Sequence, residues 1–360
     1  MKKNENNNIM TGDGRLVYFS SYEDTVIRTD NTKKEELAKK YRKKMIVKTA
    51  RRITAFVSVF AMLVSGFFLG KRGVEKYMAY SAEKTNETNR LPDDMVEKLD
   101  SMTEEEAWAY LYKQYPDLLE INFPAGMNYE YALHYAQNPQ MIGYIKIDGT
   151  NIDTPVAQAD NNKYYLTHDF YGKLTSYGAV YASYIDNFRP FDRNTLLYGH
   201  NMKDGSRFAQ LTNYKSLDYF REHPVIEFNT LYEKHKWKIY AAIITNGDIN
   251  GDDGYFFDFT FDNCSDTCFA KYVLEVDKRK LYNTGVDLLP DDKLLTLCTC
   301  TYDFDNARLI VIARMVRPGE SDEVNTSLAT YKTTPVKYPS LYYDDPQRNP
   351  YKDDEKWYLY

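Results

Sequence analysis

The sequence has few of the residues that carry nucleophilic and metal chemistry, with four cysteines and five histidines among 360 residues. The cysteines form two close pairs, Cys264 with Cys268 and Cys298 with Cys300. Outside the cell, such pairs permit disulfides or a zinc site. Two strand residues separated by one position have Cα atoms about 6.6 Å apart and parallel side chains. This spacing argues against a disulfide between Cys298 and Cys300.

Long hydrophobic runs are equally scarce, and one stands out. Residues 53–70 are eighteen residues without a charge, enough at about 1.5 Å per residue to cross most of a ~30 Å hydrocarbon layer. Ten basic and two acidic residues lie between positions 32 and 52, a local charge of +8 that leaves −14 for the rest of a chain whose total is −6. This asymmetry predicts a cytoplasmic basic tail before the run and an exterior domain from about residue 75. A cleavable signal peptide is the alternative, but its n-region is normally much shorter.

The exterior part begins with helical signals and then changes to strands. A helix is expected from Thr103 to about Tyr115, a second one ending near Asn138, and a third over 267–277 within an insertion at 248–290. From Met141 onward, short β-branched and aromatic runs alternate with turn residues, which predicts a mainly antiparallel barrel or sandwich. Beyond Pro318 the chain is polar and rich in tyrosine, without an apolar period, so poor order is expected there.

Three residues at the ends of these apolar runs offer cysteine chemistry. Cys300 ends one run, His200 ends another, and Arg308 begins a third, eight residues after the cysteine. A thiol nucleophile, a proton carrier and a cation for the oxyanion are the groups that acyl transfer requires. Taken singly, each residue is better explained as a core thiol, a structural histidine or an edge charge. Arg314 lies about 20 Å further along the third run, too far to serve the same oxyanion.

Their local sequences resemble those of the sortase family. Thr296-Leu297-Cys298-Thr299-Cys300 is similar to the TLxTC signature, Tyr198-Gly199-His200-Asn201 to the histidine motif, and Arg308 stands where the family has its arginine. The likeness extends from about Asn138 to Val316. Three upstream segments resemble class B members in particular, at residues 138–147, 152–156 and 160–166. One departure is Cys298, at a position where class B sortases often have serine.

The resemblance implies a mainly β fold: a closed eight-stranded sortase-type β-barrel with N-terminal helices and a helix-containing insertion before the cysteine strand, preceded by one transmembrane helix. The expected organisation along the chain is a cytoplasmic basic tail (1–52), a transmembrane signal anchor (53–70), a linker (71–100), the sortase catalytic domain (101–317) and a polar, tyrosine-rich tail (318–360).

The resemblance also implies an activity. Cys300 would cleave a sorting motif after threonine and form a thioacyl intermediate, which an amine of peptidoglycan or its precursor resolves. His200 would move the protons, and Arg308 would hold the substrate backbone and the oxyanion. The expected partners are surface proteins with a C-terminal sorting motif and the peptidoglycan amine, at the cell membrane and without nucleic acid. The positions expected to bind substrate are Asn162, Leu166, Tyr198, Cys298 and Thr299.

No cofactor or metal is expected, because a zinc site built from all four cysteines would consume the nucleophile. Two other functions stay open at this point. One is a different cell-wall cysteine peptidase or L,D-transpeptidase, although their local motifs are not found. The other is a non-catalytic, membrane-tethered binding module. This alternative does not explain why His200, Cys300 and Arg308 each stand in a sortase-like local motif. Because no sorting signal precedes a C-terminal hydrophobic segment, the chain is expected to be the enzyme and not its substrate.

Overall fold

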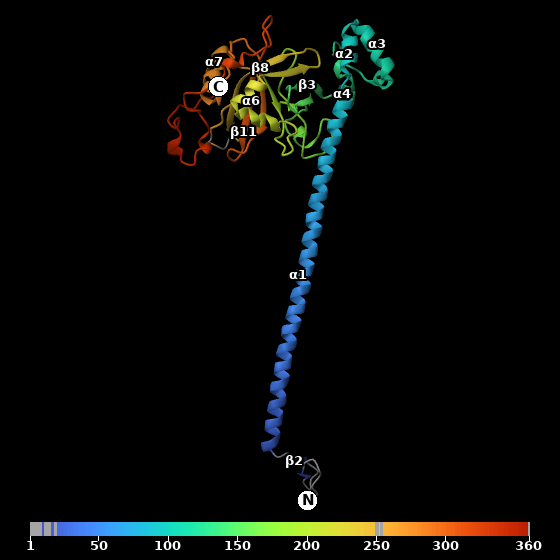
Figure 1. Cartoon of the computed structure of the whole chain (residues 1–360), viewed down its shortest axis with the longest axis vertical. Coiled ribbons are helices and arrows are strands. Elements are labelled where there is room, and N and C mark those ends of the chain that lie inside the picture. The colour runs from blue at the N-terminus through green and yellow to red at the C-terminus, as the bar shows by residue number, and fades with distance from the viewer. Residues whose placement is uncertain (1–8, 11–15, 18–19, 249–251, 253–254, 359–360) are drawn as a thin grey trace. The chain divides into compact units, whose positions relative to one another are not determined.

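The computed structural model describes the chain except residues 1–8, 11–15, 18–19, 249–251, 253–254 and 359–360 (Figure 1). The chain divides into two compact units, Met1–Val74 and Glu75–Tyr360. Helix α1, Ser20–Thr88, contributes to both. It begins within the segment expected to be the cytoplasmic basic tail, part of which lies outside the described residues. It also makes most of the expected linker helical, and α2, Asp93–Asp100, follows directly.

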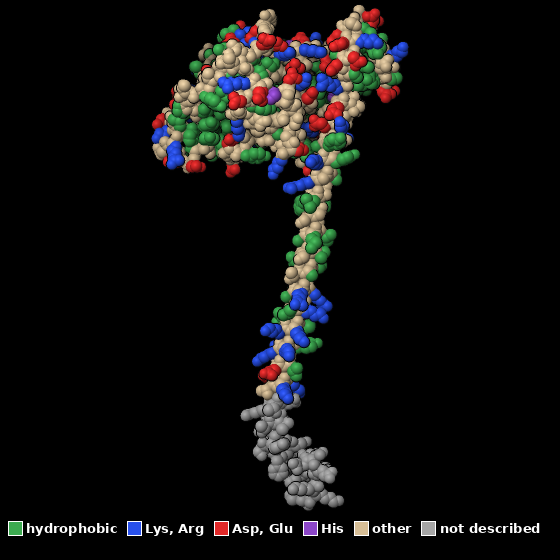
Figure 2. Space-filling model, viewed as in Figure 1, with side chains coloured by type: hydrophobic (Ala, Val, Ile, Leu, Met, Phe, Trp, Pro, Cys, Tyr) green, Lys and Arg blue, Asp and Glu red, His purple; other side chains and the backbone are tan. Residues whose placement is uncertain are grey.

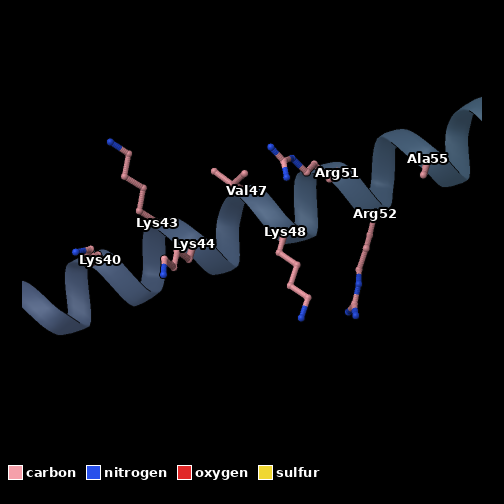
Figure 3. Close-up of a pocket in the computed structure, with 8 residues that line it drawn as sticks. All are labelled: Lys40, Lys43, Lys44, Val47, Lys48, Arg51, Arg52 and Ala55. Atoms are coloured by element: carbon pink, nitrogen blue, oxygen red, sulfur yellow. The ribbon is translucent and has the colours of Figure 1, made fainter.

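The first unit holds a short pairing of β1, Ile9–Met10, with β2, Leu16–Val17, and most of α1. An eighteen-residue window of α1 has a mean hydropathy of 2.1 and none of it is buried, so this helix is long and apolar enough to cross a membrane. Figure 2 shows basic side chains along the helix before this apolar stretch. The basic side chains surround the helix: Lys43 and Arg51 leave one side, whereas Lys48 and Arg52 leave the other (Figure 3).

The second unit opens with short helices that pack in one apolar cluster. Helix α3, Glu104–Gln114, has a capping box in which the Thr103 hydroxyl and the Glu106 carboxylate satisfy each other's backbone N–H groups. This confirms the predicted helix. Of the two residues that could cap it from the sequence, Ser101 and Thr103, the structure uses Thr103, since orphan N–H groups favour such side chains. Helix α4, Ala132–Gln137, confirms the predicted end near Asn138. Between them lie the 3₁₀ turns η1, Pro116–Glu120, and η2, Tyr129–Tyr131.

Eight strands close into a barrel in the order β10-β11-β8-β7-β3-β4-β5-β6, which confirms the predicted closed eight-stranded fold. Two neighbouring pairs, β4 with β5 and β10 with β6, are parallel, and the other ladders are antiparallel. The strands are β3 Met141–Lys146, β4 Asp153–Ala157, β5 Tyr181–Ala182, β6 Asn194–Tyr198, β7 Val225–Thr230, β8 Lys236–Asn246, β10 Leu294–Cys300 and β11 Ala307–Met315.

The strand that carries the cysteines is buried on both faces. Leu295 and Leu297 point into one apolar cluster, whereas Leu294 and Cys298 point into another on the opposite face. This follows from the period-two alternation of side chains along a strand. The remaining short helices between the strands are α5 Tyr164–Thr167, η3 Ala209–Lys215 and α6 Leu217–Glu222.

The insertion before the cysteine strand contains the predicted helix, α7, Asp266–Arg279, capped by Ser265. After it, β9, Tyr282–Asn283, pairs with β12, Thr330–Tyr331, from the C-terminal tail. Trp357 of the tail packs near Tyr272 of α7, with ring centroids 6.0 Å apart. The expectation that the tail lacks order is therefore wrong for its described residues. Its other elements are η5 Thr326–Leu328, η6 Ser340–Tyr342 and η7 Pro346–Arg348.

The tail is ordered because some of its aromatic side chains reach apolar surfaces that lie far away in sequence. Trp357 packs against the cluster that contains Phe257 and Phe269, and Tyr338 packs against the cluster on the other face of β10. Lys337 forms an ion pair with Asp354 at 2.9 Å within the tail itself. An apolar period is therefore not required for order, since isolated anchors suffice where a surface receives them.

Candidate active site

The ends of the parallel strands β6 and β10 bring the predicted histidine and cysteine together. Tyr198 is directly opposite Cys298 in this register. The pairing continues past the strand end, because the Gly199 N–H donates to the carbonyl of Cys298 at 3.2 Å. One step further, the side-chain amide of Asn201 donates to the carbonyl of Cys300 at 2.9 Å. The segment that carries His200 is thus fixed beside the end of the cysteine strand.

The third predicted residue comes from the neighbour on the other side of β10. In the antiparallel register of β10 with β11, Cys300 is directly opposite Arg308. Such cross-strand pairs place their Cβ atoms about 4.5–5.5 Å apart. His200, Cys300 and Arg308 therefore belong to three neighbouring chain segments along one rim of the barrel, with the cysteine in the middle.

The guanidinium of Arg308 lies against Gly247, the residue that follows β8. Its Nη1 donates to the carbonyls of Asn306 and Ala307, at 3.2 and 3.1 Å. A Cβ on Gly247 would come within 2.7 Å of the Arg308 Cζ, so the absence of a side chain there leaves room for the guanidinium. Arg308 is half-buried. This arrangement keeps a permanently charged fork of donors near the cysteine while its neighbours are neutral carbonyls.

The ring of His200 is held from the α5 side. Its Nε2 lies 2.8 Å from the carbonyl oxygen of Leu166. Because a carbonyl only accepts hydrogen bonds, Nε2 carries a proton in this arrangement. The backbone carbonyl of His200 accepts from the Phe208 N–H at 3.0 Å. Both the ring and the backbone of this histidine are therefore positioned by surrounding backbone groups.

Cys298 differs sharply from Cys300 in its surroundings. It is 3% exposed and packs in the apolar cluster next to α7, whereas Cys300 is half-buried at the strand end. Burial raises the pKa of the Cys298 thiol to about 12, while the nearby Arg308 lowers it and Cys300 raises it further. The Cys298 thiol is therefore neutral at physiological pH and poorly suited to nucleophilic attack. None of the four cysteines forms a disulfide, and all four lie in the described part of the chain.

The residues expected to bind substrate fall into two groups. Three lie around the rim: Tyr198 stacks on Tyr181 at 5.3 Å, Asn162 accepts the Tyr181 hydroxyl on its backbone carbonyl at 3.1 Å, and Leu166 is exposed. Thr299 lies on the opposite face of β10 from Cys298. It is 2% exposed, and its hydroxyl donates to the carbonyl of Gly199 at 2.8 Å.

Two residues at the site were not anticipated from the sequence. Tyr181 of β5 is buried and pairs with Tyr198 of β6, and its pKa is raised mainly by burial and further by Cys298 and Cys300. Asn201 secures the carbonyl of Cys300. The sequence shows that Asn201 directly follows the histidine, but it does not indicate that the Asn201 side chain bonds to the carbonyl of Cys300. Tyr181 carried no signal, because it is one of 34 tyrosines.

No group of three or more potential metal ligands occurs among the residues that the structure describes. The chemistry of the rim is that of a thiol, an imidazole and a guanidinium. These groups match nucleophile, proton carrier and oxyanion donor for acyl transfer at a carbonyl.

Comparisons with known proteins find one family. Residues 145–316 match the family model of the sortase domain. Sortase B of Listeria monocytogenes is 30% identical over 181 residues, which cover 50% of this chain and 71% of that protein. Sortase B of Staphylococcus aureus is 27% identical over 182 residues, 50% of this chain and 72% of that protein. The solved sortase B of Clostridium perfringens is 31% identical, with a TM-score of 0.46, and covers 51% of this chain and 98% of that one.

The chain therefore belongs to the sortase family, whose members are cysteine transpeptidases. Within the family it is a class B sortase, as its upstream segments indicated. The matched region contains the barrel strands with His200, Cys300 and Arg308. The whole of α1 and the tail beyond residue 316 lie outside it.

Proposed function

We propose that this chain cleaves a sorting motif after threonine and transfers the released acyl group to an amine of peptidoglycan or its precursor. The observation that carries the proposal is the placement of His200, Cys300 and Arg308 on three neighbouring segments of one barrel rim. Family membership supports the reaction class, and the rim supplies one residue for each chemical role.

The proposed reaction has two acyl transfers. The Cys300 sulfur attacks the carbonyl carbon of threonine, and the C–N bond to the next residue breaks as His200 gives a proton to the leaving amine. The resulting thioester is attacked by the accepting amine, which loses a proton to His200 as the C–S bond breaks and the thiolate leaves. Arg308 donates hydrogen bonds to the oxygen that becomes negative in both steps.

The substrate contacts are part of the same proposal. Asn162, Leu166 and Tyr198 would line the groove that receives the sorting motif. Cys298 would form the floor beneath the nucleophile, because it is buried on the same face of β10. Thr299, which bonds to Gly199, would act through the backbone that leads to His200.

The direct test is mass spectrometry of the purified full chain with a panel of sorting-motif peptides, with and without triglycine as the accepting amine. We expect a peptide cleaved after threonine, an acyl adduct on Cys300 and a transfer product when the amine is present. Cys300→Ala should abolish all three. Cys298→Ser should retain most activity, because the buried thiol has no chemical step. An active Cys300→Ala together with an inactive Cys298→Ser would refute the assignment of the nucleophile.

We further propose that α1 anchors the enzyme with residues 1–52 in the cytoplasm and the domain from residue 75 outside. The support is the basic segment on one side of the apolar stretch, shown in Figures 2 and 3, since basic residues favour the cytoplasmic side. Protease added to intact cells stripped of their wall should digest the domain beyond residue 75. Complete protection of that domain, with digestion only after lysis, would reverse the orientation.

A further inference from the structure

Arg207 is a buried charge that the proposed mechanism does not use. It follows the histidine segment, its side chain is 7% exposed, and its backbone φ of 58° lies in the left-handed region. A buried guanidinium loses hydration that its partners must replace. A side-chain-bearing residue other than Asn or Asp rarely adopts positive φ without surrounding constraints. Both features require that the fold hold this arginine in place.

The guanidinium of Arg207 connects two parts of the chain. Its Nε donates to the carbonyl of Gly178 at 2.9 Å. Its Nη1 lies 3.7 Å from a carboxylate oxygen of Glu83, in the final turns of α1. Arg207 also forms a β-bridge with Asn201, whose side chain secures the carbonyl of Cys300. One residue thus contacts α1, the loop before β5 and the segment that carries His200.

Gly178 in turn packs directly against the catalytic histidine. A Cβ on Gly178 would lie 3.0 Å from the Cδ2 of His200 and 2.4 Å from the carbonyl oxygen of Tyr165. The same Cβ position is 3.0 Å from the Leu166 carbonyl oxygen, which accepts the proton of His200 Nε2. The imidazole is therefore confined by Gly178 on one side and by Leu166 at its Nε2. A shift of the Gly178 carbonyl would move one of these two supports.

The end of α1 holds the same loop at further points. The Ser176 hydroxyl donates to the carboxylate of Glu75 at 2.9 Å. The Tyr171 hydroxyl donates to the side-chain oxygen of Asn86 at 2.6 Å. Together with Glu83, these contacts tie the loop of residues 167–178 to about three turns of α1. The loop that confines His200 is thus packed against the C-terminal turns of this helix.

We propose that Arg207 is a positioning residue for His200 and that Glu83 of α1 is its counterion, so that the final turns of α1 are part of the catalytic unit. The proposal rests on the proposed function for its kinetic test. Arg207 acts through Gly178: it fixes the glycine carbonyl, and the glycine fixes the plane of the imidazole. Because proton transfer depends on the direction of the ring nitrogens, a displacement of about 1 Å is sufficient to lower turnover up to ~10²-fold.

The experiment uses the full chain in detergent micelles and four variants: Arg207→Met, Arg207→Lys, Glu83→Gln and Glu87→Gln. Glu87 is the matched control, because it lies one turn after Glu83 on α1 and is 63% exposed in an ion pair with Lys84. Three quantities are measured: kcat and KM on the best sorting peptide, the pH profile of Cys300 alkylation by iodoacetamide, followed on the Cys300 peptide by mass spectrometry, and the melting temperature.

We expect Arg207→Met to lower kcat by about 10- to 100-fold with KM changed less than about twofold, and to shift the pH profile of alkylation. Arg207→Lys should recover part of the loss, because an ammonium can still donate to the Gly178 carbonyl. Glu83→Gln should lower kcat by a smaller factor, and Glu87→Gln should match the wild type. If Arg207→Met does not fold, Arg207→Lys and Glu83→Gln decide the question, since Glu83 is 43% exposed and its neutral, isosteric replacement should leave the fold intact.

Wild-type kcat and alkylation profiles in the folded Arg207 variants would overturn the proposal. So would equal effects of Glu83→Gln and Glu87→Gln, or a loss of kcat that only follows the melting temperature. If the wild type turns over no peptide at all, the proposed function fails instead. The alkylation profiles then still decide whether Arg207 positions the His200–Cys300 pair, because alkylation requires no sorting motif.

Discussion

The two ends of β11 carry the same residue type in opposite circumstances. Arg308 at the start of the strand is opposite Cys300, and Arg314 near its end is opposite Leu294. Arg314 is 2% exposed and bonds to Glu320 through both Nη atoms at 2.7 Å. It also contacts Asp287 at 3.0 Å. The contacts of Arg308 are with neutral backbone carbonyls and a glycine.

This difference assigns the two arginines of one strand to different tasks, Arg314 to the stability of the fold and Arg308 to the proposed chemistry. The charge of Arg314 is neutralised within the protein, and its donors are occupied. The charge of Arg308 stays available near the thiol, where a substrate carbonyl would arrive. The comparison predicts that substitution at one end lowers stability and substitution at the other lowers turnover.

The larger effect is expected at the stable end. Arg314→Met removes one basic partner from Glu320, which keeps Lys238, and one from Asp287, which keeps Arg317. Loss of one member of a fully buried pair costs about 3–5 kcal/mol. Because these carboxylates are 26% and 59% exposed, we expect a decrease of about 2–3 kcal/mol in the free energy of unfolding. Urea denaturation followed by circular dichroism measures it. Turnover per folded molecule should stay within about twofold, and a loss of about tenfold would break the comparison.

The second effect, on turnover instead of stability, is expected at the end that carries Arg308. Arg308→Lys replaces a planar fork of donors by a point charge. Loss of one oxyanion donor lowers the rate by ~10²–10³, so we expect at least about a tenfold loss of kcat. The melting temperature should not change, since the described contacts of Arg308 are with backbone carbonyls and include no ion pair. Kinetics on one fluorogenic sorting peptide test this, with Arg314→Lys as the control. Equal losses of kcat in both variants would make the role of Arg308 structural.

The sequence predicted the barrel well because its strands follow simple local rules. Runs such as residues 236–246 and 307–315 are apolar and β-branched, and turn residues separate them. The cap at Thr103 was readable because a threonine and a glutamate three residues later satisfy each other's N–H groups. The nucleophile, histidine and arginine were proposed from motifs at strand ends, and the structure brings the three together.

The tail was misjudged because its order depends on partners far away in sequence. Trp357 finds the cluster around α7, and Thr330 and Tyr331 find β9. No window of the tail contains an apolar face of its own, so a local pattern gives no sign of these contacts. The contacts of the expected linker were not predicted for the same reason, since Asn86 and Glu83 contact Tyr171 and Arg207, which lie far away in the sequence.

By itself, the sequence determined the barrel strands and the apolar stretch in α1, and its motifs led to the proposal of the reactive groups, since all of these depend on neighbouring residues. Only the tertiary structure decided which cysteine is accessible. Cys298 and Cys300 lie on the same strand and point to the same face. The cluster that includes α7 buries Cys298, whereas Cys300 at the rim is half-buried. It also decided the surroundings of His200, because Leu166, Gly178, Arg207 and α1 meet there from segments that lie far apart in the sequence. Closure of the barrel brings these segments together. Their proximity therefore cannot be predicted from a local sequence pattern.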